Sequence, residues 1–159
     1  MNIFYLHPDP KIAAKAMTNT HCVKMILESA QLLSTAHHVL DEQNASPNLY
    51  KATHRNHPSA IWVRESIENY KWLYQHFVAL CQEYTNRYGK THLTQIKLEE
   101  LLKNPPINIP KVPATPMRIA ITNTAWHVKN NPVQSYRNYY VGEKLKLQND
   151  ITRYHSIIV

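Results

Sequence analysis

A chain of 159 residues is long enough for one compact domain with a hydrophobic core and too short for two ordinary domains. Its net charge of +7, with 10 histidines counted as neutral, favours a polyanionic partner, above all nucleic acid. The two cysteines lack the CxxC spacing of a zinc site, and no apolar run approaches the ~20 residues that cross a bilayer. We therefore expect one cytoplasmic domain over residues 1–159 with no cofactor, no metal and no membrane contact. The oligomeric state is left open.

The first half of the chain predicts helices. Only 2 glycines, together with apolar residues repeated at helical spacing, indicate an all-α fold. A short helix is expected from Pro10 to about Met17, because proline fits the first turn of a helix. A second helix begins near Thr18–Thr20, whose side chains are all suitable N-caps, and ends near Leu40. Residues 42–58 are polar and predict a loop.

The longest predicted helix runs from about Ser59 to Tyr88 and stops at Gly89. A continuous apolar stripe with a period of 3.6 residues identifies it as a core helix. Trp72 is the exception, because it lies on the polar side of this helix. Either a loop or another helix covers its ring, or the ring offers a stacking surface for a base.

The second half of the chain is less regular. A short helix is expected around Leu93–Lys103, followed by an irregular connecting segment over residues 104–131 that is rich in proline. Within it, residues 117–129 fit a strand or a helix equally well. A last helix starts at Pro132, and residues 148–159 are interpreted as a tail. The predicted architecture is a single helical domain with a proline-rich loop between the central and C-terminal helices.

The second helix carries an unusual polar stripe. His21, Lys24, Glu28, Gln31 and Thr35 follow one another at spacings of three and four residues, so they share one helix face, opposite an apolar face. A solvated surface is the simplest interpretation of such a face.

The stripe also has a chemical interpretation, since Glu28 is the best-placed carboxylate of the chain for general acid–base work. A metal site is disfavoured, because His21 and Glu28 lie two turns, roughly 10 Å, apart with the cation Lys24 between them.

Two further segments mix basic and aromatic residues. His54, Arg55 and His57 precede the long helix, where they form either a polar loop or a phosphate contact beside a helix N-terminus. The segment Tyr136–Tyr140, which contains Arg137, has two interpretations. Its tyrosines either pack in the core, or they stack on bases while basic residues contact phosphates.

In this order, the three segments resemble the small all-α pyrimidine-dimer DNA glycosylases, the endonuclease V type known from T4-like phages. In that family a helix near the N-terminus carries a His and, seven residues later, the catalytic Glu, and His21 and Glu28 have this spacing. His57 matches a His just before the long central helix. The segment Tyr139–Lys144 is similar to the family's C-terminal Tyr-Tyr pair followed by Gly and Lys. The resemblance covers roughly residues 1–88 and 136–144.

The resemblance implies an endonuclease V-like fold in which the N-terminal segment threads between helices. It also implies attack by the N-terminal α-amine on the sugar C1′ to form a Schiff base, supported by Glu28. The family's nucleophile is a Thr exposed by removal of Met, whereas the second residue here is Asn2. Methionine is usually retained before so large a side chain, so Met1 would carry the amine. The arginines that flank the family's Glu are Leu27 and Gln31 here, so a phosphate-clamping role is either lost or moved to Lys24.

The leading hypothesis is therefore a DNA glycosylase/AP lyase with Glu28 and the amine of Met1 or Asn2 as catalytic groups. We expect that amine, Glu28 and His57 to converge on one cleft, with Lys24 at its rim and Tyr139 or Tyr140 nearby. The expected nucleic-acid contacts are His21, Lys24, Gln31, His54, Arg55, His57, Arg137, Tyr139, Tyr140 and Lys144.

Two alternatives belong to other classes of protein. One is a non-catalytic phage protein that binds a small nucleotide ligand or modified base, for example to sequester a host signal. The other is a structural or assembly protein that inherited the same scaffold.

Overall fold

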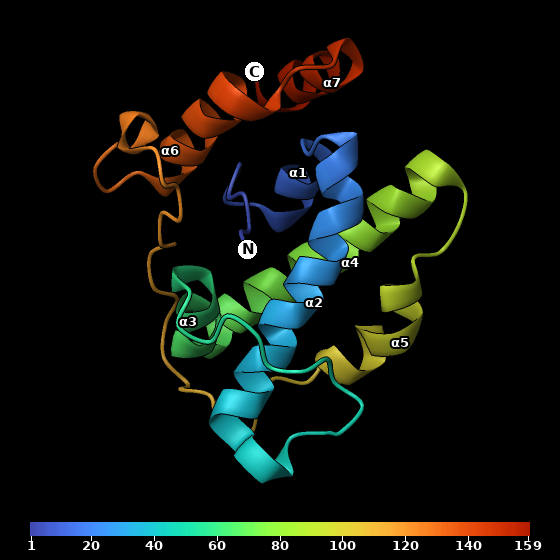
Figure 1. The fold of residues 1–159 in the computed structure, drawn as a ribbon, viewed down its shortest axis with the longest axis vertical. Helices are drawn as coiled ribbons and strands as arrows, with labels where there is room; N and C mark the ends of the chain where they lie inside the picture. The colour runs from blue at the N-terminus through green and yellow to red at the C-terminus, as the bar shows by residue number, and fades with distance from the viewer.

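The computed structural model describes all of residues 1–159 and contains helices but no strand, which confirms the all-α prediction (Figure 1). The helices are α1 Pro10–Lys15, α2 Asn19–Asp41, α3 Pro58–Glu65, α4 Ile67–Tyr88, α5 Leu93–Leu102, α6 Pro132–Tyr139 and α7 Gln148–Ile158, with a π-helical turn at Tyr140–Lys144.

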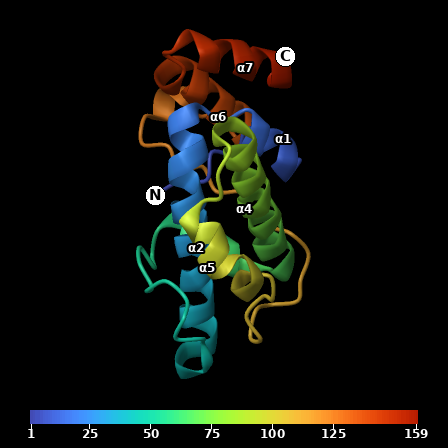
Figure 2. The same cartoon turned by 90° about the vertical axis from the view of Figure 1, so that its right-hand side faces the viewer.

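The long helices α2 and α4 pack against each other and form the centre of the molecule. Helix α1 packs against α4, whereas α3 and α5 contact both long helices. The C-terminal helices α6 and α7 lie across one end of this group, next to the N-terminal segment (Figures 1 and 2). The irregular segment after α5 runs along one side of the molecule and connects the two ends (Figure 1).

Capping residues explain where the long helices begin and end. The Thr18 hydroxyl accepts the backbone N–H of His21 at 3.1 Å, so Thr18 is the N-cap of α2. Gly89 follows α4 with φ 69°, the left-handed conformation that glycine adopts without steric cost. The stop expected at Gly89 is confirmed.

The prediction of a single long helix from Ser59 to Tyr88 is wrong, because Ser66 separates this segment into α3 and α4. Ser66 has extended backbone angles of φ −152° and ψ 141°, and its Oγ accepts the N–H of Glu68. The same hydroxyl donates to the carbonyl of Val112 at 2.7 Å. The break is therefore stabilised by a residue of the irregular segment, which local periodicity does not reveal.

The C-terminal residues described above as a tail form helix α7. Asp150 in its first turn accepts the backbone N–H of Asn19 at 3.0 Å and pairs with Arg153 at 2.8 Å. Tyr154 is buried, with its ring 5.8 Å from that of Tyr140. These contacts with the start of α2 and with the π-helical turn hold the segment in place.

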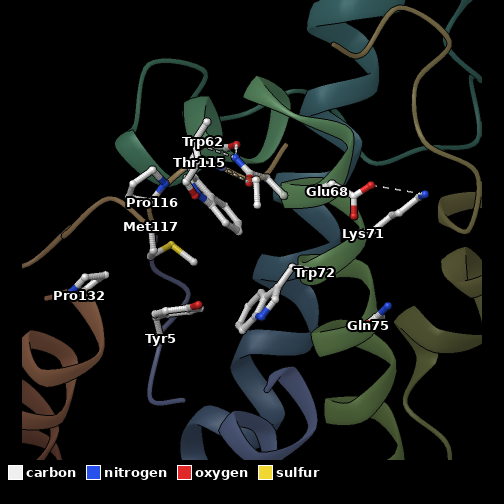
Figure 3. Close-up of a pocket in the computed structure, with 12 residues that line it drawn as sticks. Tyr5, Trp62, Glu68, Lys71, Trp72, Gln75, Thr115, Pro116, Met117 and Pro132 are labelled. Carbon is white, nitrogen blue, oxygen red and sulfur yellow. Dashed lines mark hydrogen bonds and ion pairs between the residues drawn. The ribbon is translucent and has the colours of Figure 1, made fainter. Parts of the chain in front are cut away.

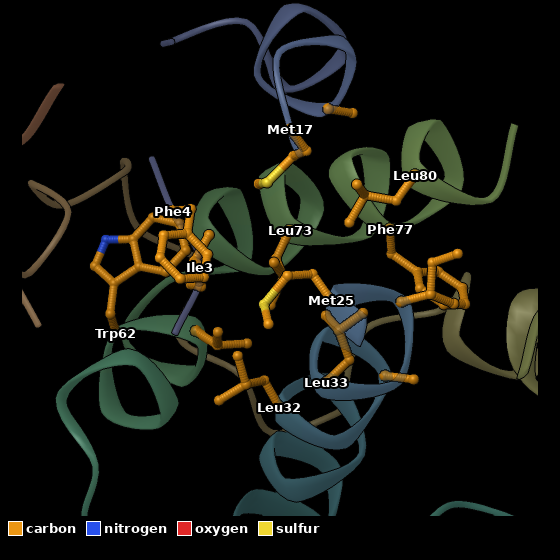
Figure 4. Close-up of a cluster of buried hydrophobic side chains, with 14 of the residues drawn as sticks. Ile3, Phe4, Met17, Met25, Leu32, Leu33, Trp62, Leu73, Phe77 and Leu80 are labelled. Atoms are coloured by element: carbon orange, nitrogen blue, oxygen red, sulfur yellow. The ribbon is translucent and has the colours of Figure 1, made fainter. Parts of the chain in front are cut away.

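The N-terminal segment threads through the core, as the family resemblance implies. Ile3, Phe4 and Leu6 are buried, and the first two lie among side chains of α2 and α4 in Figure 4. The Arg137 side chain on α6 donates to the carbonyl of Leu6 at 2.8 Å. The start of the chain is thus a structural element and not a free end.

We predict that Leu6→Ala lowers the free energy of unfolding by about 2–5 kcal/mol, because Leu6 is fully buried and the truncation leaves a cavity. Urea denaturation monitored by circular dichroism measures this change. Ile96→Ala is the matched control, since Ile96 is 69% exposed and its truncation should cost little. A loss below about 1 kcal/mol for Leu6→Ala would show that the N-terminal segment is not part of the core.

A candidate active site around the N-terminal amine

One cleft of about 350 Å³ collects most of the residues that the sequence predicted to act together. It lies where the N-terminal segment, α2, the start of α3 and the C-terminal segment meet. Its lining consists of Met1, Asn2, Phe4, His21, Lys24, Met25, Glu28, His57, Ala120, Thr122, Tyr139 and Lys144. The expected convergence of the amine, Glu28 and His57, with Lys24 and Tyr139 beside them, is confirmed.

The Asn2 side chain fixes the position of the N-terminal amine. Its Oδ1 accepts the backbone N–H groups of Ile3 and Phe4, at 2.7 and 3.1 Å. Its Nδ2 donates to the carbonyl of Ala120 at 3.0 Å. Asn2 thereby ties the N-terminal segment to the irregular segment, and the amine nitrogen of Met1 lies 3.6 Å from Glu28 Oε1.

Glu28 is not on a solvated face, which corrects the simplest interpretation of the polar stripe. The N-terminal segment covers this part of α2, so that Glu28 is only 8% exposed. Its Oε2 lies 3.8 Å from Lys24 Nζ but has no hydrogen-bond partner in the protein. A buried acceptor without a partner costs free energy, so this oxygen can accept a hydrogen bond from a group that enters the cleft.

His21 is held by residues from both ends of the chain. Its Nδ1 lies 3.0 Å from the hydroxyl of Tyr140, and its ring stacks on Phe4 with the centroids 4.2 Å apart. The pKa of His21 is lowered to about 4, mainly by burial and also by the nearby charges of Lys144 and Lys24, whereas Asp150 opposes this shift.

The hydroxyl of Tyr140 stays protonated, because burial raises its pKa. It accepts the N–H of Thr18 at 2.7 Å, and its own proton has two acceptors within reach, His21 Nδ1 at 3.0 Å and Met17 Sδ at 3.8 Å. We assign the proton to the nitrogen, which is the stronger acceptor. The single hydrogen of the neutral imidazole is then on Nε2.

His57 combines a structural role with a place in the cleft. Its Nδ1 accepts the N–H of Ser59 at 3.0 Å, which makes His57 the N-cap of α3. Burial lowers the pKa of His57, the N-terminal amine and His54 lower it further, and Glu28 opposes them. A neutral His57 is required for this cap, because only the neutral ring has a lone pair to accept a hydrogen bond.

The C-terminal Tyr-Tyr pair is divided between the cleft and the core. Tyr139 lines the cleft, stacked 6.1 Å from Phe4, and Lys144 Nζ lies 5.1 Å from its ring centroid. Tyr140 and Tyr136 are fully buried. Neither of these two rings is exposed for stacking on a base, so Tyr139 is the one tyrosine of this segment that lines the cleft, while the Tyr140 hydroxyl contacts His21.

Besides Tyr140, four predicted contact residues lie outside the cleft. His54 and Arg55 occupy the exposed loop before α3, and the Arg55 carbonyl accepts from Arg64 at 2.8 Å. Gln31 is half-buried on α2 and does not line the cleft. Arg137 holds the carbonyl of Leu6, so it positions the N-terminal segment and does not face the cleft.

No sequence pattern pointed to Ala120 and Thr122, which line the cleft from the irregular segment. They reach it through long-range contacts, such as the bond from Asn2 to Ala120. Trp72, the exception on α4, is covered by the N-terminal segment, because its Nε1 donates to the Pro8 carbonyl at 2.7 Å. No three His, Cys, Asp or Glu side chains are grouped as metal ligands would be.

Together, the fold and the cleft define a helical protein of the endonuclease V type with its N-terminal amine beside a buried glutamate. A family model described as pyrimidine dimer DNA glycosylase matches residues 1–96, which span α1 to α4 and the start of α5. The chain therefore belongs to the pyrimidine dimer DNA glycosylase family, and membership implies a DNA substrate. No match was found among curated proteins or solved structures. None of the helices is both long and apolar enough to cross a bilayer.

We predict that His21 stays neutral until the pH falls to about 4. Because the unfolded chain protonates this histidine near pH 6.5, its burial destabilises the fold progressively between pH 6.5 and about 4. Imidazole nitrogen shifts followed by NMR give the pKa directly. Lys144→Gln should raise this pKa by removing a nearby positive charge, whereas Lys90→Gln, on the exposed turn after α4, should not change it. A His21 pKa near 6.5 in the intact protein contradicts the burial of its ring.

Proposed function

We propose that the protein is a DNA glycosylase/AP lyase that uses the α-amine of a retained Met1 as its nucleophile. The single observation that carries the proposal is the 3.6 Å distance between this amine and Glu28 Oε1 inside the cleft. If Met1 were removed, the new amine would start one residue later, about 3.5 Å along the chain. Asn2, the residue that would then carry it, is the one that anchors the segment.

Glu28 is the proposed proton carrier of the reaction. It accepts a proton from the ammonium group, and the free amine then attacks C1′ of the deoxyribose. The bond from nitrogen to C1′ forms as the glycosidic bond breaks, and the base leaves with the bonding electron pair and takes up the proton that the attacking nitrogen loses. The protonated Glu28 then returns its proton to O4′ as the sugar ring opens to a Schiff base. Removal of a C2′ proton by the regenerated carboxylate expels the 3′ phosphate and cuts the strand.

The cations around the cleft support a DNA substrate. Lys24 is 66% exposed at the rim, and Lys144 lies beside the ring of Tyr139. In this proposal, both lysines bind phosphates and Tyr139 contacts a sugar or base. The exposed His54 and Arg55 extend this basic surface along the loop before α3.

We expect borohydride to trap a covalent adduct between the protein and DNA that contains an abasic site. Peptide mapping by mass spectrometry should place the adduct on a fragment that begins with Met1. A form extended by one glycine before Met1 is the matched control. Its amine is about 3.5 Å further along the chain than that of Met1, so it no longer lies beside Glu28 and should be trapped far less.

An adduct on a lysine, or none at all, rules out the proposed nucleophile. If no adduct forms and a free nucleotide raises the melting temperature, the non-catalytic nucleotide binder becomes the better assignment.

Glu28→Gln should lower the rate of cleavage about 10²-fold or more, because it removes the proton acceptor and keeps the size of the side chain. Binding to DNA should persist or tighten, since one negative charge near the phosphates is lost. Single-turnover cleavage of abasic DNA, normalised to folded protein, measures the effect. Glu100→Gln, an equivalent change on the exposed side of α5, should leave the rate unchanged. Unaltered cleavage by Glu28→Gln would make this residue structural.

The affinity for duplex DNA should fall with salt, with a log–log slope of about −0.9 for each phosphate contacted. Lys24→Gln and Lys144→Gln should each reduce the steepness of that slope by about 1, because each removes one phosphate contact. Fluorescence anisotropy over a salt series gives these slopes, with Lys90→Gln as the control. An absence of DNA binding at ~50 mM salt would contradict a DNA substrate.

A further inference from the structure

A groove of about 420 Å³ lies between α1 and α4, and nothing in the proposed reaction uses it. Side chains of these two helices line it, and none of them lines the cleft. In Figure 2, α1 and the N-terminus lie on opposite sides of the molecule. A ligand in this α1–α4 groove would therefore not occupy the cleft.

The floor of the α1–α4 groove is apolar and elongated. Val78 and Ala79 are half-buried, so part of their apolar surface remains exposed there. The lining residues of α4 extend from Tyr74 to Asn86, which corresponds to about 18 Å along the helix axis. The ring of Tyr74 is held in place, because its hydroxyl donates to the carbonyl of Glu99 at 2.8 Å. A floor of this shape favours a linear apolar group.

Two cations without a partner line the α1 wall of the groove. Lys11 and Lys15 are separated by one turn of α1, and neither ammonium group makes an ion pair within the protein. On α4, in contrast, Lys71 pairs with Glu68 at 3.8 Å (Figure 3). Two lysines four residues apart repel each other on a helix, and the helix dipole further disfavours Lys11 in the first turn. The pair therefore places uncompensated positive charge beside the apolar floor.

The acidic groups near the groove do not neutralise this pair. Glu83, the one carboxylate that lines the groove, pairs with Arg87 Nε at 3.1 Å. Asp9 caps α1 by accepting the backbone N–H of Lys11 at 2.9 Å, and it pairs with neither lysine ammonium. The groove thus has no anion of its own to balance the two lysines.

We propose that the α1–α4 groove binds a free medium-chain fatty acid. The alkyl chain lies along Val78 and Ala79, and the two carboxylate oxygens accept from the ammonium groups of Lys11 and Lys15. Side chains four residues apart on a helix start roughly 6 Å from each other, so both flexible lysines reach one carboxylate. A volume of about 420 Å³ is within the range of small-ligand pockets. A protein partner would need a much larger surface.

The test titrates the protein with decanoate, below the micelle concentration, and follows the methyl signals of Val78 by NMR. These signals should shift, with a Kd in the millimolar range or tighter. Octanoate should bind more weakly, by up to about fourfold for each buried methylene group that is lost. Decyltrimethylammonium has the same alkyl chain but should not bind, because its positive charge is repelled by the two lysines.

Lys11→Gln and Lys15→Gln should each weaken decanoate binding about 2- to 5-fold, the effect of losing one partly exposed ion pair. The double variant should weaken it further. Both side chains are exposed, so these changes leave the core intact, which circular dichroism verifies. Lys97→Gln is the matched control, because Lys97 is exposed on α5 and does not line the groove.

The proposal is overturned if decanoate leaves the Val78 signals unchanged, or if decyltrimethylammonium binds equally well. It is also overturned if the double variant binds decanoate as tightly as the unchanged protein. Binding to vesicles of anionic phospholipid without binding of free decanoate would assign the lysines to a membrane surface instead. These outcomes do not depend on the proposed reaction, because borohydride trapping on abasic DNA reports on Met1 and the double variant leaves the cleft intact.

Discussion

The structure depends on the burial of Ile3, Phe4 and Leu6 of the N-terminal segment between α2, α4 and the C-terminal helices. Ile3 and Leu6 contribute apolar surface to the core, and this burial stabilises a segment that would otherwise be a mobile chain end. Because the apolar residues and the Asn2 side chain fix the path of the backbone, the amine is held beside Glu28. The same segment covers Glu28, so the N-terminal amine and this carboxylate create each other's environment.

The electrostatic balance of the cleft follows from this arrangement. One buried carboxylate faces the Met1 amine and the side chain of Lys24. The two histidines of the cleft add no charge at neutral pH, because burial lowers the pKa of both His21 and His57. The cleft therefore has a surplus of positive charge for phosphates, while the imidazoles act as hydrogen-bonding groups.

Local sequence patterns predicted the helices well where capping and periodicity decide, as they do for α1, α2 and α5. They failed at Ser66 because its partner, the carbonyl of Val112, is 46 residues away. They failed at α7 for the same reason, since Asp150 and Tyr154 are held by residues from other parts of the chain. In the site, the spacing of His21 and Glu28 was sufficient to predict that both lie on the same face of one helix. No local pattern, however, reveals that the N-terminal segment covers Glu28.

The Tyr-Tyr pair shows how the C-terminal segment completes a site whose first half is recognisable from the family. Successive residues on a helix point about 100° apart, so Tyr139 faces the cleft while Tyr140 enters the core and holds His21. Gly142 permits this path, because a Cβ at that position would overlap the ring of Trp126. The family match ends at residue 96, yet Ala120, Thr122, Tyr139 and Lys144 all line the cleft. The amine and Glu28 thus belong to the part of the chain that the family model matches, whereas Ala120, Thr122, Tyr139 and Lys144 of the opposite wall come from the part outside this match. Burial of the N-terminal segment and long-range contacts bring the two parts together.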